Sequence, residues 1–134
     1  MNELLEPILR YLRIKSVEPW LQLSTETDLL DIGCGSDATF LKDIGTRIHE
    51  GVGIDEFVTK SKRGNITTDQ VRLTHSLPFP DNRFDVVTLL AVLEHLEDDL
   101  SILREAGRVL KPGGRLVITA PSEAAQPVLE FLAY

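Results

Sequence analysis

A buried strand that ends in a glycine-rich turn constrains the fold of this chain more than any other feature. Two leucines, Asp31 and a Gly-x-Gly turn follow one another over residues 29–36. Gly33 and Gly35 have no Cβ, so the backbone can turn tightly there and approach a ligand closely. A helix that follows such a turn directs its free amide N–H groups toward the same place. Asp31 narrows the ligand class, because a carboxylate here repels a pyrophosphate but suits an ammonium group.

Apolar runs and helical periodicity alternate along the rest of the chain, which predicts an α/β domain with a doubly wound, mostly parallel sheet. The predicted strands cover residues 27–32, 52–55, 71–75, 84–90 and 115–119. The predicted helices lie around residues 4–12, 38–45 and 96–110. Ligands of such sheets bind beyond the carboxyl ends of the strands. The residues that fall at those ends are Asp31, Asp55, His75 and Leu90.

Three segments have a weaker pattern. Pro19 and Trp20 are expected to break or redirect the first helix, and the polar residues 59–69 favour no element. Residues 121–134 look like the start of another helix. We expect one domain over 1–134, with an N-terminal helix and linker (1–26), a core (27–120) and the start of a truncated C-terminal region (121–134).

Five segments carry a resemblance to a known family. They are Leu29–Ser36, Gly51–Asp55, Leu77–Val87, Ala91–Leu96 and Arg108–Gly114. In this order and spacing they resemble the motifs of class I S-adenosylmethionine-dependent methyltransferases, of the methyltransferase type 11-like group. The resemblance implies a Rossmann-like sheet with strand order 3-2-1-4-5, with the family's strands six and seven missing. It also implies S-adenosylmethionine as cofactor and S-adenosylhomocysteine as product.

The resemblance assigns roles to individual residues. The backbone of Gly33, Cys34 and Gly35 would line the cofactor, and Asp31 would lie near the methionyl ammonium, directly or through water. Asp55, 20 residues after Gly35, would bind the ribose hydroxyls. The complete set of predicted cofactor-binding residues is Asp31, Gly33, Cys34, Gly35, Asp55, Glu56, Ser76, Leu77, Leu90 and His95.

Three of these residues also have a simpler alternative role. Asp31 could cap a turn, Asp55 could be a solvated turn carboxylate, and His95 could pack beside the methionine tail rather than act as a base. Cys34 has no adjacent histidine, which argues against a nucleophile. No catalytic residue is assigned.

The sequence departs from the family pattern in three places. Asp37 replaces the third glycine of the first motif, and residues 71–76 lack the aspartate that often meets the adenine amino group. Ser76 or a backbone group could substitute for that aspartate. The chain ends at Tyr134, so we expect a fragment or a shortened family member.

Composition excludes several classes of function. A formal net charge of −7 argues against nucleic-acid binding. One cysteine cannot form an intrachain disulfide, no apolar run approaches the roughly 20 residues of a membrane span, and the N-terminus does not resemble a signal peptide. The three histidines lack metal-ligand spacing. We therefore expect a cytoplasmic protein without a metal site.

Methyl transfer to an unidentified, small-molecule acceptor is the leading hypothesis. A non-catalytic S-adenosylmethionine-binding or regulatory module is the first alternative. An NAD(P)-dependent oxidoreductase is the second, because Gly33-x-Gly35-x-x-Ala38 fits the dinucleotide fingerprint. We also predict self-association, through residues 115–119 as an open sheet edge or through the apolar segment 121–134.

Overall fold

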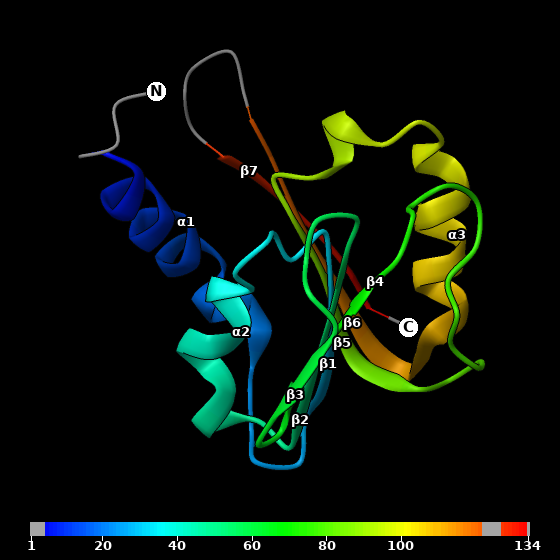
Figure 1. Ribbon diagram of the computed structural model, residues 1–134, viewed down its shortest axis with the longest axis horizontal. Helices are drawn as coiled ribbons and strands as arrows, with labels where there is room; N and C mark the ends of the chain where they lie inside the picture. The colour runs from blue at the N-terminus through cyan, green and yellow to red at the C-terminus, as the bar shows by residue number, and fades with distance from the viewer. Residues whose placement is uncertain (1–4, 122–126, 134) are drawn as a thin grey trace.

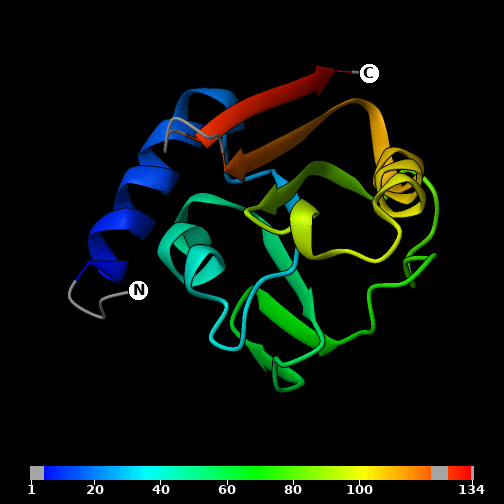
Figure 2. The ribbon, with the colours of Figure 1, turned by 90° about the horizontal axis from the view of Figure 1, so that it is seen from above.

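The computed structural model describes residues 5–121 and 127–133 and forms one seven-stranded sheet with helices on both faces (Figures 1 and 2). The strands are β1 (Asp28–Ile32), β2 (Glu50–Asp55), β3 (Ser61–Arg63), β4 (Ile66–Gln70), β5 (Phe84–Leu90), β6 (Leu110–Pro121) and β7 (Pro127–Ala133). The helices are α1 (Glu6–Leu21), α2 (Thr39–Ile44) and α3 (Asp99–Val109), with short 3₁₀ turns η1 (Gly45–Arg47) and η2 (Leu93–His95). Seen from above, α1 and α2 cover one face of the sheet and α3 covers the other.

The sheet order is β3-β4-β2-β1-β5-β6-β7. Its five central strands β4, β2, β1, β5 and β6 are parallel, which confirms the predicted Rossmann-like core, but the full order differs from the predicted 3-2-1-4-5 by one antiparallel strand at each edge. β3 and β7 pair antiparallel at the two edges of the sheet, and neither was predicted.

The third parallel strand lies earlier in the chain than its prediction. It covers Ile66–Gln70, whereas residues 71–75 form no strand. Gly64, with a φ of 59°, provides the turn of a hairpin between β3 and β4. Val71 and Leu73 instead pack from a loop against the core on the α3 side. Their apolar side chains are buried by loop packing, which periodicity cannot distinguish from a short strand.

The predicted open edge is also wrong, because β7 pairs with β6 from Arg115 opposite Ala133 to Pro121 opposite Pro127. Part of the predicted helix over residues 121–134 is therefore a strand, and residues 122–126 and 134 lie outside the described part of the chain. An added antiparallel strand satisfies the N–H and C=O groups that an edge would leave free. Residues 115–119 are therefore not an open edge through which the chain could self-associate.

Helix α1 continues through Pro19 and ends at Leu21, so the predicted break does not occur. Pro19 lies in the last turn, where the missing N–H costs only one helical hydrogen bond. Val17 and Leu21 are fully buried against the sheet, and this packing holds the turn. The helix stops at Gln22, whose φ is 48°.

Two apolar layers hold the sheet, because successive strand residues point to opposite faces. Leu29 and Val86 face α1 and α2, whereas Leu30 and Val87 face α3. The fully or nearly fully buried side chains on the α3 side include Ile32, Ile54, Phe84, Leu89, Ile102, Val109 and Leu116. Those on the opposite side include Val17, Leu21, Leu41, Ile44 and Val117.

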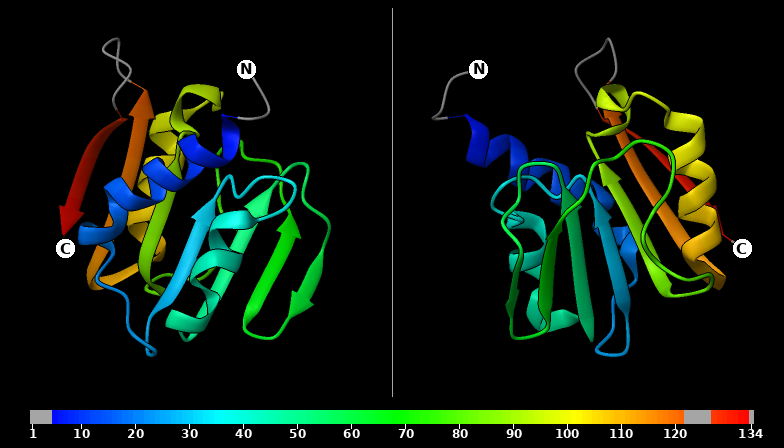
Figure 3. Two further views of the ribbon diagram at one scale, coloured as in Figure 1. Left: turned by 90° about the vertical axis from the view of Figure 1, so that its left-hand side faces the viewer. Right: turned by 45° about the vertical axis from the view of Figure 1, so that its right-hand side comes forward.

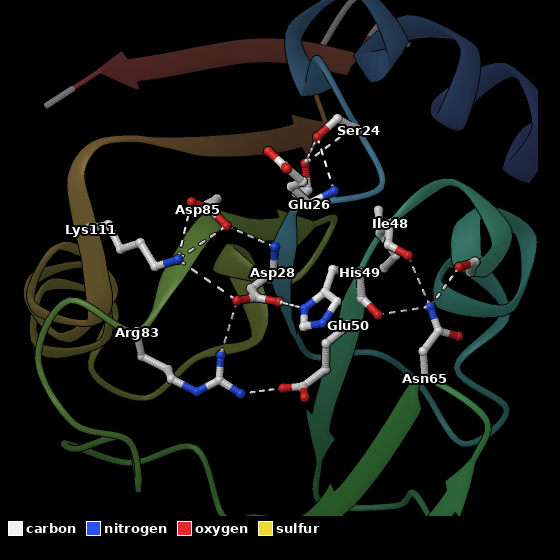
Figure 4. Close-up of polar contacts among 12 residues, drawn as sticks. Ser24, Glu26, Asp28, Ile48, His49, Glu50, Asn65, Arg83, Asp85 and Lys111 are labelled. Carbon is white, nitrogen blue, oxygen red and sulfur yellow. Dashed lines mark hydrogen bonds and ion pairs between the residues drawn. The ribbon is translucent and has the colours of Figure 1, made fainter.

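A charge cluster centred on Asp28 joins the amino ends of the central strands (Figure 4). Asp28 lies 2.6 Å from Nδ1 of His49, and 3.7 Å from both Arg83 and Lys111. Its backbone N–H donates to Asp85 at 2.8 Å. Single exposed ion pairs stabilise little, but a network fixes several strands at once. This cluster lies at the end of the sheet opposite to the one where ligands of parallel sheets bind.

Candidate functional site

A cavity of about 430 Å³ lies at the carboxyl ends of β1, β2 and β5. It is lined by Gly33, Asp55, Glu56, Phe57, Arg72, Leu73, Thr74, Val92, His95, Leu96 and Glu97. We call this the strand-end cavity. Its position is the one that a doubly wound sheet uses for ligands.

Gly33 begins the turn after β1 with a φ of 76°. Its N–H and that of Cys34 donate to the carbonyl of Ile54, at 2.8 and 3.1 Å, which fixes the turn to β2. A Cβ on Gly33 would lie 2.4 Å from Cγ2 of Val92, so a side chain here would force Val92 to move. Gly35 also has a positive φ, 79°, but faces open space. Glycine is therefore required by sterics at one position and by backbone conformation at both.

Asp55 is held by both of its carboxylate oxygens. The N–H of Gly35 donates to Oδ2 at 3.0 Å, and the N–H of Phe57 donates to Oδ1 at 2.8 Å. These bonds connect the end of β2 to the glycine turn after β1. Each carboxylate oxygen has two acceptor sites, so Asp55 retains capacity for two hydroxyl donors from a ligand.

Asp31 lies beneath the turn and is only 2% exposed. The pKa of its carboxyl is raised from 3.8 to about 7: burial is the largest cause, the hydrogen bond from Thr88 opposes it, and the nearby Asp55 charge adds to it. Oγ1 of Thr88 donates to Oδ1 of Asp31 at 2.7 Å. A buried carboxylate with one neutral donor is poorly compensated, and a ligand cation would stabilise its ionised form.

Cys34 packs into the core rather than toward a reactant. A Cβ added to Gly53 would lie 2.9 Å from Sγ of Cys34, so the thiol fills the space above that glycine. Burial, together with the charges of Asp31 and Asp55, raises the pKa of the thiol to about 12. The thiolate is the nucleophilic form, so this environment is the opposite of an activated cysteine.

The turn after β5 forms the far wall of the strand-end cavity. Ala91 has a φ of 57°, and its N–H donates to the buried Oγ1 of Thr119 at 2.8 Å. The chain then enters η2, where the N–H of His95 donates to the carbonyl of Val92 at 2.9 Å. The His95 ring is 78% exposed, and its Nε2 lies 3.6 Å from Glu94.

The structure brings four of the ten predicted residues to the cavity wall: Gly33, Asp55, Glu56 and His95. Gly35 and Asp31 lie just behind it, bonded as described, and Cys34 supports the turn. Ser76, Leu77 and Leu90 do not line it: Ser76 is exposed, and Leu77 is buried with its N–H donating to Glu105 at 2.9 Å. Asp37, which stands in place of the family's third glycine, does not have a positive φ, whereas the next residue, Ala38, has a φ of 49°.

Several wall residues were missed by sequence reasoning. Phe57 follows the β2 acid and is 79% exposed, an unusual environment for a phenylalanine. Arg72 lies 3.9 Å from Glu56, and Leu73 and Thr74 complete that side. The sequence did contain a signal for Phe57, because this aromatic residue lies two positions after Asp55, the predicted ribose-binding acid. The loop residues Arg72, Leu73 and Thr74 gave no such signal, because a strand was predicted over residues 71–75, where the structure has a loop.

Within the described residues, no group of three or more histidine, cysteine or carboxylate side chains is arranged to hold a metal ion. In the same part of the chain, no helix is both long enough and apolar enough to span a membrane.

The parallel core, the glycine turn and the acid at the end of β2 define a nucleoside-binding class of α/β protein. A methyltransferase-domain model matches residues 30–118, and the chain belongs to this methyltransferase family. It is 35% identical over 118 residues to a demethylmenaquinone methyltransferase of Listeria monocytogenes, a match that covers 80% of this chain and 50% of the relative.

One further relative and one solved structure are also similar to this chain. A ubiquinone/menaquinone biosynthesis C-methyltransferase of Ectopseudomonas mendocina is 42% identical over 78 residues, covering 58% of this chain and 30% of the relative. The crystal structure of the YcgJ protein from Bacillus subtilis superimposes with a TM-score of 0.71 at 27% identity, covering 82% of this chain and 50% of that one. The chain thus spans about half the length, or less, of these three relatives.

Proposed function

We propose that this chain forms the cofactor-binding part of a methyltransferase that transfers the methyl group of S-adenosylmethionine to a small-molecule acceptor. The observation that carries the proposal is the Asp55 carboxylate, which is held by two backbone amides and lines the strand-end cavity. A carboxylate oriented in this way suits the two hydroxyls of a ribose.

The charge of the cavity supports S-adenosylmethionine over a dinucleotide. Asp55, Glu56 and Glu97 line the wall and Asp31 lies beneath it, whereas Arg72 is the lone arginine or lysine of the lining. S-adenosylmethionine carries a sulfonium and an ammonium group, and carboxylates stabilise both. The pyrophosphate of a nicotinamide dinucleotide would meet these carboxylates with unfavourable charge.

Different parts of the cavity wall suit different parts of S-adenosylmethionine. Phe57 and Leu73 offer apolar surface for the adenine, and Thr74 offers a hydroxyl near it. The methionine part would lie along Gly33 toward His95, with its ammonium near Asp31. The cofactor supplies an activated methyl group, so the chain's own contribution is to hold it in place for in-line transfer.

The acceptor proposed here is a quinone-type ring that is methylated on carbon. Support comes from the names of the two curated relatives, one a demethylmenaquinone methyltransferase and one a ubiquinone/menaquinone C-methyltransferase. The alternative of a non-catalytic binding module predicts cofactor binding without turnover. Transfer of labelled methyl groups to a demethylated quinone distinguishes the two.

Calorimetry with S-adenosylhomocysteine tests the cofactor assignment. Asp55→Ala should weaken binding by about 1–3 kcal/mol, because the ribose hydroxyls lose a charged acceptor. Asp43→Ala is the matched control, because Asp43 is an exposed carboxylate on α2 outside the cavity. Equal affinity of both variants would reject the role of Asp55, and tighter binding of NADH would reject the cofactor.

A further inference from the structure

A second cavity, of about 760 Å³, lies on the α2 face of the sheet, between α2 with η1 and the β3–β4 hairpin. Figure 3 (left) shows this part of the fold, with α2 in front of the sheet and the hairpin at its edge. Residues 56–65, all of them described, connect β2 to β4 without a helix. Parallel strands are usually joined by a helix that covers the sheet, so this connection leaves the face open. We call this second cavity the hairpin cavity.

The hairpin cavity concentrates positive charge in an acidic chain of net charge −7. Lys42 comes from α2, Lys60 from the segment before β3, and Arg63 from β3 itself. One carboxylate, that of Asp37, lines the same space. Within the described residues, no carboxylate lies within 4.0 Å of any of the three cationic groups. Their charges are therefore available to a ligand.

The rest of the lining is a mixture of hydroxyl groups and a small apolar floor. Ser36, Thr46, Thr59 and Ser61 supply the hydroxyls, and Ala38, Val58 and Ile66 supply the floor. Successive residues of a strand alternate between faces, so Ser61 and Arg63 line the cavity while Lys62 does not. Cations, hydroxyls and a limited apolar area are the combination that a phosphorylated small molecule requires.

Asn65 fixes the two walls of the hairpin cavity relative to each other (Figure 4). Its side-chain amide donates to the carbonyls of Gly45 at 2.7 Å, Ile48 at 3.1 Å and His49 at 3.2 Å. On the other side, the hydroxyl of Thr68 donates to the carbonyl of Thr59 at 2.7 Å. The cavity is therefore formed before a ligand binds, which reduces the entropic cost of binding.

We propose that the hairpin cavity binds a phosphorylated small molecule. Its phosphate would lie between Lys42 on one wall and Lys60 with Arg63 on the other, and its apolar part would lie on Ala38, Val58 and Ile66. A guanidinium binds phosphate oxygens in pairs, and lysine adds point charges. The hairpin cavity and the strand-end cavity have no lining residue in common, so both ligands can bind at once.

Inorganic pyrophosphate is the probe, because it carries the charge of such a ligand without an adenosine that could enter the strand-end cavity. Calorimetry at physiological salt should show binding to the wild-type chain. The double variant Lys60→Gln with Arg63→Gln should weaken it at least tenfold. Lys62→Gln is the control for position, because it removes one positive charge from the opposite face of β3 and should change affinity less than twofold.

Saturating S-adenosylhomocysteine separates this proposal from the cofactor assignment. Pyrophosphate affinity should be unchanged when that ligand is bound, and the Lys60 and Arg63 double variant should bind S-adenosylhomocysteine as the wild type does. Three results would each overturn the proposal: no pyrophosphate binding, an equal loss in Lys62→Gln, or displacement by S-adenosylhomocysteine. Circular dichroism of each variant shows whether the fold is retained.

Discussion

Thr88 and Asp31 are register partners on the parallel strands β5 and β1, and the Thr88 hydroxyl donates to the Asp31 carboxylate at 2.7 Å. This hydrogen bond lowers the pKa of the Asp31 carboxyl, but burial raises it more, and the net pKa is about 7. An acid whose pKa is raised by folding makes the folded state less stable as the pH rises from the unfolded value toward the folded one. In the absence of ligand, Asp31 therefore reduces the stability of the fold at neutral pH.

Asp31→Asn should remove this pH-dependent loss of stability, because asparagine carries no charge and keeps an oxygen that accepts the hydrogen bond from Thr88. Between pH 4 and pH 7.5, the free energy of unfolding of the wild type should fall by up to about 4 kcal/mol relative to that of this variant. Urea denaturation at several pH values measures the difference. Thr88→Val removes the donor and raises the folded-state pKa of Asp31 further, so the loss of stability should become larger and extend to higher pH. Parallel stability profiles for wild type and Asp31→Asn would contradict the account of Asp31.

Cofactor binding should release a proton at pH 6, where Asp31 is protonated in most free molecules. A cationic ligand favours the carboxylate, so its pKa falls on binding. Titrations of S-adenosylmethionine in buffers of different ionisation enthalpy measure the number of protons released. We expect a value approaching one at pH 6, none at pH 8.5, and none in Asp31→Asn. Equal release by wild type and variant would place the titrating group elsewhere.

The two glycines of the turn should differ in their tolerance of a side chain. Both have a positive φ, but a Cβ on Gly33 would overlap Val92 and one on Gly35 would meet open space. Gly33→Ala should therefore destabilise the fold by about 1–3 kcal/mol more than Gly35→Ala. Adding Val92→Ala should recover part of the Gly33→Ala loss. Equal losses for the two single variants would show that overlap with Val92 is unimportant.

Phe57 should contribute to binding through the adenine. Its ring is 79% exposed and lines the strand-end cavity, so stacking on a base would bury it. Phe57→Ala should weaken S-adenosylhomocysteine binding by about 1–3 kcal/mol, and Phe57→Trp should preserve it. Leu100→Ala is the control, because Leu100 is also exposed, at 62%, but lies on α3 outside the cavity. A similar loss in both variants would argue against stacking.

Most of the central fold was predictable because the strands at its centre are mainly apolar. Phe84–Leu90 was predicted with the bounds that the structure shows, since a strand buried on both faces has a nearly continuous apolar run, interrupted here by Asp85 and Thr88. The hairpin over residues 61–70 was not predictable, because its polar side chains lie at a sheet edge and its pairing is set by tertiary contacts. The strand β7 was missed for a related reason, since apolar content alone does not separate a helix from a strand.

The site was predictable where it depends on strand ends and was missed where it depends on loops. Gly33 and Asp55 follow directly from the motif and the sheet. Thr88 was visible only as a polar residue within an apolar strand, and its partner required the register between β1 and β5. Arg72, Leu73 and Thr74 reach the cavity through a loop whose path no local pattern specifies.

Amide NMR during a titration with S-adenosylhomocysteine tests the central claim most directly, because it locates the ligand without a variant. The account predicts saturable shifts of the amide signals of Gly33, Gly35 and Phe57, which surround Asp55, and no shift of Gly64 at the tip of the hairpin. The absence of shifts up to millimolar ligand would contradict the account. Shifts confined to the β3–β4 hairpin would contradict it equally.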